Sequence, residues 1–257
     1  MNIIPLPAFR DNYIWLLHDG HHALVVDPGD AAPVEDALAR YGLTLSAILI
    51  THHHPDHVGG VGALRARHPV PVYGPAAEHI EGVDRPLGDG GEIRLDAPAA
   101  AFRVIEVPGH TAGHIAFVGT GPSNGVLFCG DTLFSAGCGR LFEGTPAQLA
   151  ASLACLAALP DETRVYCTHE YTLSNLAFAR AAEPDNGARD AYALHCEALR
   201  ARGEPTLPST IGREKAINPF LRCAQPAVLD ALTRETGTRP ADTLACLTAL
   251  RAWKDRF

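Results

Sequence analysis

A dense histidine run directly after a short apolar segment constrains this chain more than any other feature. Ala47–Ile50 has the composition of a buried β-strand, and it continues into Thr51-His52-His53-His54-Pro55-Asp56-His57. An extended chain sends alternate side chains to the same side, so His52 and His54 can point together while His53 faces away. A fold that carries this run must therefore deliver ligands to a metal from the end of a strand.

The next two polar residues of the run extend the same ligand set. If a helix begins near Asp56, both Asp56 and His57 project from its first turn into the space that the preceding histidines face. Pro55 fits this reading, because a proline lacks an N–H and its fixed φ suits a first helical turn. Nitrogen and oxygen donors without a thiolate are typical of zinc, iron or manganese. The run therefore predicts a metal site.

Three further ligand candidates follow later apolar segments. His110 comes after Phe102–Val107, and Asp131 and His169 stand in the same relation to Val126–Cys129 and Arg164–Cys167. Taken alone, an Asp after a strand is more often a helix cap or turn former. Together the three repeat one arrangement, strand then ligand, by which sheet-based sites gather distant residues. Seven ligands with one shared carboxylate would give two metals four protein ligands each.

The pattern of apolar runs changes about two-thirds of the way along the chain. Up to about residue 171, short strand-like runs alternate with helical patterns, which predicts an α/β layered domain. From about Thr172, Ala- and Leu-rich helical stretches dominate, and Glu204–Arg213 is expected to be a loop. The expected strands are Tyr13–Leu17, Ala23–Asp27, Ala47–Ile50, Val70–Tyr73, Phe102–Val107, Ile115–Val118, Val126–Cys129 and Arg164–Cys167. The expected helices are Pro33–Tyr41, His57–Arg67, Pro146–Ala158, Leu173–Ala182, Ala188–Arg202, Pro226–Thr236 and Ala241–Phe257.

Composition and charge narrow the expected partners and location. The net charge of −8 argues against nucleic acid or a membrane surface as the main partner. No apolar signal-peptide core and no membrane-spanning run are visible. The seven cysteines contain no C-x-x-C pair, which speaks against a disulfide scaffold and favours a reducing cytoplasm. We expect a cytoplasmic monomer that acts on a small molecule.

Seven sequence blocks, spread over nearly the whole chain, carry a resemblance to known proteins. They are Thr51–Gly60, Pro108–His114, Gly130–Phe134, Ala136–Gly144, Cys167–Tyr171, Asn218–Phe220 and Trp253–Phe257. The blocks that contain the metal motif resemble the metallo-β-lactamase superfamily and by themselves support only that superfamily. Within it, the last four blocks are most similar to the glyoxalase II family of glutathione thioester hydrolases.

The resemblance implies a fold and a division of the ligands. Residues 1–171 would form a four-layer αβ/βα sandwich, and residues 172–257 an all-helical domain that helps to hold glutathione. Asp131 would bridge two divalent metals, most simply zinc, with iron or manganese as alternatives, and Asp56 would also orient the bridging hydroxide. The remaining ligands divide into His52, His54 and His110 for the first metal, and Asp56, His57 and His169 for the second.

The implied reaction is hydrolysis of the thioester of an S-(2-hydroxyacyl)glutathione. With S-D-lactoylglutathione the products would be glutathione and D-lactate, the second step of methylglyoxal detoxification. Phe142 stands where some relatives carry Tyr, which removes a hydroxyl contact. Arg251 and Lys254 are three residues apart, on one face of the last predicted helix. The residues expected to bind the substrate are Arg140, Phe142, Tyr171, Arg251 and Lys254.

Other functions remain open at this point. A β-lactamase, a lactonase, a nuclease or a mononuclear-iron persulfide dioxygenase could share the metal motif. A secreted lactamase should carry a signal peptide, a nuclease should have a basic surface, and a one-iron dioxygenase should not need seven ligands. A metal-binding protein without activity should close its coordination sphere completely, which fits a shared carboxylate poorly.

Overall fold

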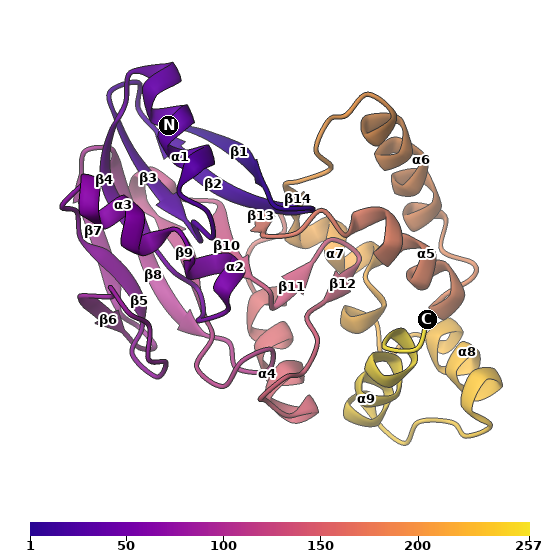
Figure 1. The fold of residues 1–257 in the computed structure, drawn as a ribbon. Coiled ribbons are helices and arrows are strands. Elements are labelled where there is room, and N and C mark those ends of the chain that lie inside the picture. Colours follow the sequence, from indigo (N-terminus) through magenta and orange to yellow (C-terminus); the bar gives the residue numbers. More distant parts are fainter.

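Two six-stranded sheets lie face to face in the computed structural model, which describes residues 1–257 (Figure 1). The order of the first sheet is β1-β2-β3-β4-β5-β6, and that of the second is β14-β13-β10-β9-β8-β7. The first sheet consists of β1 (Asn2–Ala8), β2 (Asn12–His18), β3 (His22–Val26), β4 (Thr44–Leu49), β5 (Val72–Pro75) and β6 (Arg85–Leu87). The second consists of β7 (Glu92–Asp96), β8 (Ala99–Glu106), β9 (Ile115–Thr120), β10 (Val126–Gly130), β13 (Arg164–Cys167) and β14 (Ser209–Thr210).

Strand β2 shows why the chain forms layers. Trp15 and Leu17 belong to the large core that also contains Phe102 and Phe117 of the second sheet. Ile14 and Leu16, on the other face of β2, belong to a separate core beneath α1 (Ala32–Tyr41) and α3 (Val61–Arg67). Both faces of the strand are therefore buried, which explains its continuous run of apolar residues. The predicted αβ/βα sandwich is confirmed.

Helices make up most of the chain after residue 171 and lie beside the sandwich (Figure 1). The helices are α5 (Thr172–Ala182), α6 (Gly187–Ala201), α7 (Ile211–Ile217), α8 (Pro226–Thr236) and α9 (Thr243–Lys254). Apolar side chains of α5, α7, α8 and α9 join the large core together with those of α4 (Pro146–Ala157), whereas those of α6 form a smaller separate core with part of α5. None of the helices combines the length and apolar character needed to cross a membrane.

A small hairpin joins the sandwich to these helices. Strands β11 (Leu133–Phe134) and β12 (Gly137–Cys138) pair with each other, and Ala136 between them has a positive φ of 56°. The buried carboxylate of Glu214 accepts a hydrogen bond from the backbone N–H of Ala136 at 2.7 Å. The Asn218 amide donates to the carbonyl of Gly137 at 2.9 Å. Helix α7 therefore fixes the hairpin that lies between Asp131 and Arg140.

One helical expectation was wrong in detail. The helix expected over His57–Arg67 is two helices, α2 (Pro55–Val58) and α3. They separate at Gly59 and Gly60, where a Cβ on Gly60 would lie 2.6 Å from the Pro28 carbonyl oxygen. The backbone of the Pro28–Ala31 loop can therefore approach closely only because the side chain is absent.

Some strands were not expected at all. Strand β1 contains Pro5 and Pro7, which hide it in the sequence, but it pairs only with β2 at the edge of its sheet, where proline is tolerated. The expected loop Glu204–Arg213 contains β14, which pairs with β13, and the first turn of α7. The expectation that strands end at residue 171 was therefore wrong at β14.

Candidate metal centre

The seven predicted ligands meet where strands of the two sheets end. His52 and His54 follow β4, and His110 lies beyond the end of β8. Asp131 directly follows β10, and His169 is two residues beyond β13. The two other members, Asp56 and His57, lie on α2, which begins at Pro55. The ligand residues that follow separate strands in the sequence therefore come together in the folded protein.

The first group consists of three imidazoles. Nε2 of His52 and Nε2 of His110 each lie 3.0 Å from Nδ1 of His54. All three ligand atoms fall within 4.8 Å of one another. Three convergent nitrogens are a suitable donor set for zinc or another transition metal.

The second group combines a carboxylate with two imidazoles. Oδ2 of Asp56 lies 3.6 Å from Nε2 of His57 and 3.5 Å from Nε2 of His169. These ligand atoms also fall within 4.8 Å of one another. Asp56 gives the second group one anionic ligand, whereas the first group consists of imidazoles alone.

Asp131 lies between the two groups. Its Oδ1 is 3.5 Å from Nε2 of His57, and its Oδ2 is 3.4 Å from His110 and 3.3 Å from His169. Oδ1 of Asp131 and Nε2 of His57 are buried and have no hydrogen-bond partner in the protein. Buried polar atoms are almost always satisfied. These two unpaired atoms face one another and could both be satisfied as ligands of bound cations.

Contacts with outer oxygen atoms favour one ring orientation for these imidazoles. His110 Nδ1 lies 2.8 Å from the Arg140 carbonyl, and His57 Nδ1 lies 3.0 Å from Oδ2 of Asp27. Each contact occupies the nitrogen that faces away from the centre. Such contacts are usual around metal-binding histidines, because they select the tautomer that leaves the other nitrogen free to coordinate.

Burial and the neighbouring carboxylates act in opposite directions on the imidazoles of the centre. Burial lowers the pKa of His52 and His110, which keeps these rings neutral. Burial acts in the same direction on His169, but the carboxylates of Asp131, Asp11 and Asp56 together outweigh it and raise the pKa of His169 to about 9. Burial alone would raise the pKa of Asp131, but His57 and His169 hold it well below its usual range. The surroundings of the Asp131 carboxylate therefore favour positive charge, which a divalent cation can supply in place of protons on the histidines.

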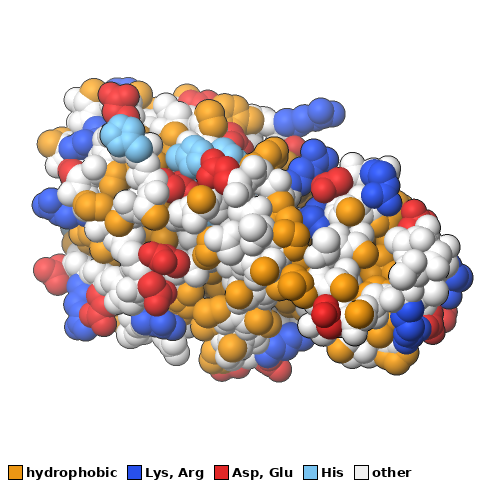
Figure 2. All heavy atoms as spheres, turned by 90° about the horizontal axis from the view of Figure 1, so that it is seen from below, with side chains coloured by type: hydrophobic (Ala, Val, Ile, Leu, Met, Phe, Trp, Pro, Cys, Tyr) orange, Lys and Arg blue, Asp and Glu red, His pale blue; other side chains and the backbone are white.

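Two other histidines of the region lie outside both groups. His53 points away from the centre, with Nδ1 2.9 Å from Glu78 and Nε2 3.1 Å from Glu143. His114 lies behind the centre, where its Nε2 accepts a hydrogen bond from the Asp131 backbone N–H at 3.2 Å. Figure 2 shows one face on which histidine side chains reach the surface beside acidic ones. Neither His53 nor His114 adds a donor to the two groups.

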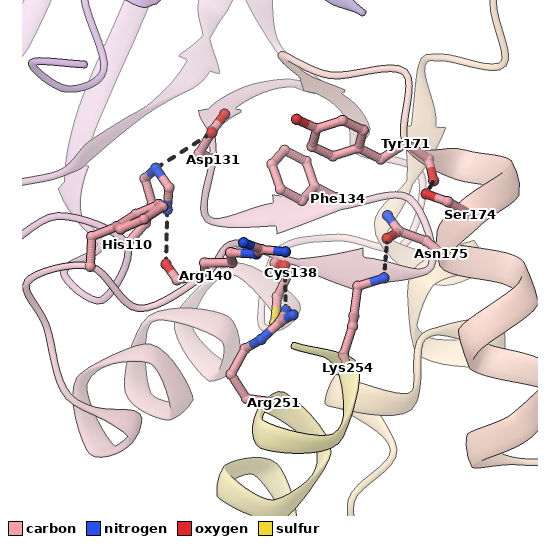
Figure 3. Close-up of a pocket in the computed structure, with 11 residues that line it drawn as sticks. His110, Asp131, Phe134, Cys138, Arg140, Tyr171, Ser174, Asn175, Arg251 and Lys254 are labelled. Atoms are coloured by element: carbon pink, nitrogen blue, oxygen red, sulfur yellow. Dashed lines mark hydrogen bonds and ion pairs between the residues drawn. The ribbon is translucent and has the colours of Figure 1, made fainter. Parts of the chain in front are cut away.

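A pocket of about 500 Å³ opens beside the cluster, which is a size typical of small-molecule sites. Figure 3 shows His110 and Asp131 at one side of it and Arg140, Arg251 and Lys254 at the other. The pocket thus joins the candidate metal centre to three cationic side chains. Its lining residues are His110, Asp131, Phe134, Cys138, Arg140, Phe142, Tyr171, Ser174, Asn175, Arg251 and Lys254.

Two aromatic residues of the pocket lining contact imidazoles of the metal centre. The ring of Tyr171 stacks on His169 with centroids 4.6 Å apart. The ring of Phe142 is 64% exposed and meets His54 and His110 edge-on, at 5.4 Å and 5.3 Å. Phe142 therefore presents an apolar surface at the mouth of the pocket.

The cations differ in how free they are to bind a ligand. Lys254 donates to Oδ1 of Asn175 at 2.6 Å, and burial lowers its pKa to about 8. Arg251 is only 3% exposed and donates to the Cys138 carbonyl at 2.9 Å and to Asp255 at 3.0 Å. The helical spacing predicts that Arg251 and Lys254 can both contact one ligand, and both side chains line the pocket. In the structure the guanidinium of Arg251 is also hydrogen-bonded to the protein, so its binding role stays a prediction.

Four lining residues were not singled out from the sequence. Phe134 and Cys138 belong to the hairpin, within the blocks that carry the resemblance. Ser174 and Asn175 lie on α5, one turn beyond Tyr171. Their spacing from Tyr171, three and four residues along a helix, is the only signal that could have pointed to them.

Comparison with known proteins supports the class that the fold and the donor set define. A family model described as "Metallo-beta-lactamase superfamily" matches residues 8–169. The crystal structure of ETHE1 from Myxococcus xanthus has a TM-score of 0.66 and 27% sequence identity, covering 99% of this chain and 100% of that one. TTHA1623 in a di-iron-bound form has a TM-score of 0.59 and 29% identity, covering 86% and 100%. The protein is thus a metallo-β-lactamase-fold protein with a dinuclear metal site.

The remainder of the chain defines the family within that class. A model described as "Hydroxyacylglutathione hydrolase C-terminus" matches residues 170–257. The hydroxyacylglutathione hydrolase of Cupriavidus taiwanensis is 58% identical over 265 residues, covering 100% of this chain and 99% of the relative. That of Chromohalobacter salexigens is 56% identical over 259 residues and covers 100% of both. The chain belongs to the hydroxyacylglutathione hydrolase, or glyoxalase II, family.

Proposed function

We propose that this protein hydrolyses the thioester of an S-(2-hydroxyacyl)glutathione, with S-D-lactoylglutathione as the representative substrate. The observation that carries the proposal is the single pocket that joins the Asp131 cluster to Arg140 and Lys254. The end of the pocket at Asp131 is suited to metal-dependent hydrolysis. The end at Arg140 and Lys254 is suited to a substrate with two carboxylates, even though the chain as a whole has a net charge of −8.

The proposed metal ligands are the two groups with Asp131 shared between them. His52, His54 and His110 would hold one cation, and Asp56, His57 and His169 the other, with zinc as the expected metal. When bound, the metals supply Lewis acidity, which lowers the pKa of water from about 15.7 to about 7 and polarises a carbonyl group. Neutral His52 and His110 and an ionised Asp131 are the protonation states that such binding needs, and a bound cation would take the place of the proton that Asp131 favours on His169.

Residues of the chain would orient the reactants. Asp56 is the only second-group ligand with a partly exposed side chain, 39%, so its carboxylate can accept a hydrogen bond from the attacking water. Phe142 and Tyr171 would flank the thioester, and the cations would bind the glutathione carboxylates. The leaving thiolate has a pKa of about 8.5, so departure needs no dedicated acid. The pocket lining contains no protonated carboxyl group placed for that role.

The test is release of glutathione from S-D-lactoylglutathione by the purified protein. Turnover should be lost after chelation and return when zinc is added back. Inactive chelated protein that stays inactive after reloading, or turnover of a simple ester but not of this thioester, would contradict the proposal.

A further inference from the structure

The turn between β1 and β2 reaches the candidate metal centre from the first sheet. Its last residue, Asp11, and the first residue of β2, Asn12, lie beside His169. The Tyr13 backbone N–H donates to the Thr168 carbonyl at 2.6 Å, and the Glu170 N–H donates to the Asp11 carbonyl at 2.8 Å. The backbone on both sides of His169 is therefore tied to this turn.

The side chains of the same two residues contact two proposed ligands of one metal. Oδ1 of Asp11 accepts a hydrogen bond from Nδ1 of His169 at 2.8 Å. The Asn12 amide donates to Oδ2 of Asp56 at 2.9 Å. Neither side chain contacts a ligand of the other group. Consecutive residues thus hold two of the three second-group ligands.

The contact of Asp11 fixes the tautomer of His169, and the contact of Asn12 fixes the orientation of the Asp56 carboxylate. The hydrogen bond to Asp11 occupies Nδ1 of His169, so Nε2 faces Asp131 at 3.3 Å with its lone pair free. Asp56 lies on α2, a helix of only four residues, and its side chain is 39% exposed. Asn12 is 5% exposed and holds one oxygen of this carboxylate toward the centre.

The ligands of the first group have no such pair of consecutive side chains that contact them. The outer nitrogen of His110 meets a backbone carbonyl, and that of His52 lies 3.1 Å from the Thr51 hydroxyl. These neutral partners come from the residue next to the ligand or from Arg140, which follows the hairpin, and not from the first turn of the chain. A change at Asp11 or Asn12 should therefore affect the two metals unequally.

We propose that Asp11 and Asn12 are positioning residues that hold His169 and Asp56 for the second metal. This inference rests on the ligand set proposed above. It assigns a role to the β1–β2 turn, which the histidine motif does not include. Removal of an outer hydrogen-bond partner of a metal ligand typically weakens metal binding by about 10- to 100-fold.

The experiment is a titration of metal-free protein with zinc against a competing chelator, which needs no substrate. Asp11→Ala and Asn12→Ala are each expected to bind the first ion within about twofold of the unmodified chain and the second about 10- to 100-fold more weakly. Asp11 is on a turn and its side chain is 31% exposed, so folding is not at stake in that variant. Asp185→Ala and Asn124→Ala control for the change of residue type alone, since both residues are exposed and lie away from the metal centre.

A rescue separates hydrogen bonding from a general loss of structure. Asp11→Asn keeps an acceptor at the same place and should recover most of the affinity that Asp11→Ala loses. Absence of recovery, or equal weakening of both ions, would overturn the positioning role. So would second-ion binding in both alanine variants as tight as in the unmodified chain. Failure of the unmodified chain to bind two ions would instead overturn the proposed ligand set itself.

Discussion

Lys254 offers the sharpest test of substrate binding, because its charge can be removed without touching the metal centre. Lys254→Met keeps the length of the side chain and its packing against Phe178, over whose ring the ammonium lies at 5.2 Å. A hydrogen bond to a charged group contributes about 1.5–3 kcal/mol. Lys254 is partly exposed, so solvent screening favours the lower end. Since 1.4 kcal/mol corresponds to a factor of ten, KM should rise about tenfold at pH 7.

The pH dependence of the same contact has a defined sign. Burial lowers the pKa of Lys254 to about 8, so the ammonium is charged below that pH and neutral above it. Binding that depends on the charge is complete below pH 8 and is lost as the pH rises. KM of the unmodified chain should therefore be flat up to about pH 8 and then rise toward the level of Lys254→Met, about tenfold higher, as the ammonium loses its proton. The value of kcat should not follow this change, because Lys254 does not touch the reacting bond.

The assay is steady-state hydrolysis of S-D-lactoylglutathione between pH 6 and pH 9.5, with bound metal measured in each variant. Lys254→Arg is the matched variant, since a guanidinium stays charged throughout this range. Its KM should lack the rise above pH 8, and KM of Lys254→Met should be high and flat. An unchanged KM in Lys254→Met at pH 7, or the same alkaline rise in Lys254→Arg, would refute the reasoning.

Three further predictions concern the centre, the pocket mouth and the fold. Asp131→Ala should reduce bound metal well below two ions per chain; unchanged stoichiometry in elemental analysis would rule out the bridging role. Phe142→Tyr places a hydroxyl at the exposed mouth of the pocket, and one added hydrogen bond of about 0.5–1.5 kcal/mol should lower KM about two- to tenfold with kcat preserved; an equal or higher KM would show that no partner lies there. Gly60→Ala puts a Cβ 2.6 Å from backbone atoms of the Pro28–Ala31 loop and should cost about 1–3 kcal/mol in urea unfolding. Gly62→Ala, with no atom within 4 Å of its Cβ, should instead stabilise α3 by about 0.5–1 kcal/mol; equal effects at the two sites would contradict the packing described.

The sequence was informative wherever one local pattern decided the structure. The His52–His57 run predicted its own geometry, because alternation along a strand and the first turn of a helix are local properties. Strands such as Arg164–Cys167 were recognisable from composition, since burial on both faces requires a continuous apolar run. The α/β layered class followed from these elements, whereas the four-layer sandwich was implied by the family resemblance. The domain boundary at residues 171–172 stays a prediction.

What the sequence could not reveal depends on partners that are far apart along the chain. Strand β1 is stabilised by pairing with β2 despite its prolines. Asp11 and Asn12 carry no motif of their own, and their positions beside His169 arise only when the two sheets meet. The engagement of Arg251 with Cys138 and Asp255 likewise depends on how α9 packs against the hairpin.

The most direct test of the account is anomalous diffraction from crystals of the zinc-loaded protein, measured at the zinc edge. The account predicts two peaks per chain, with ligand atoms at about 2.0–2.2 Å. One peak should lie among His52, His54 and His110, and the other among Asp56, His57 and His169, with Asp131 in reach of both. A single peak, or peaks that Asp131 does not join, would contradict the shared centre.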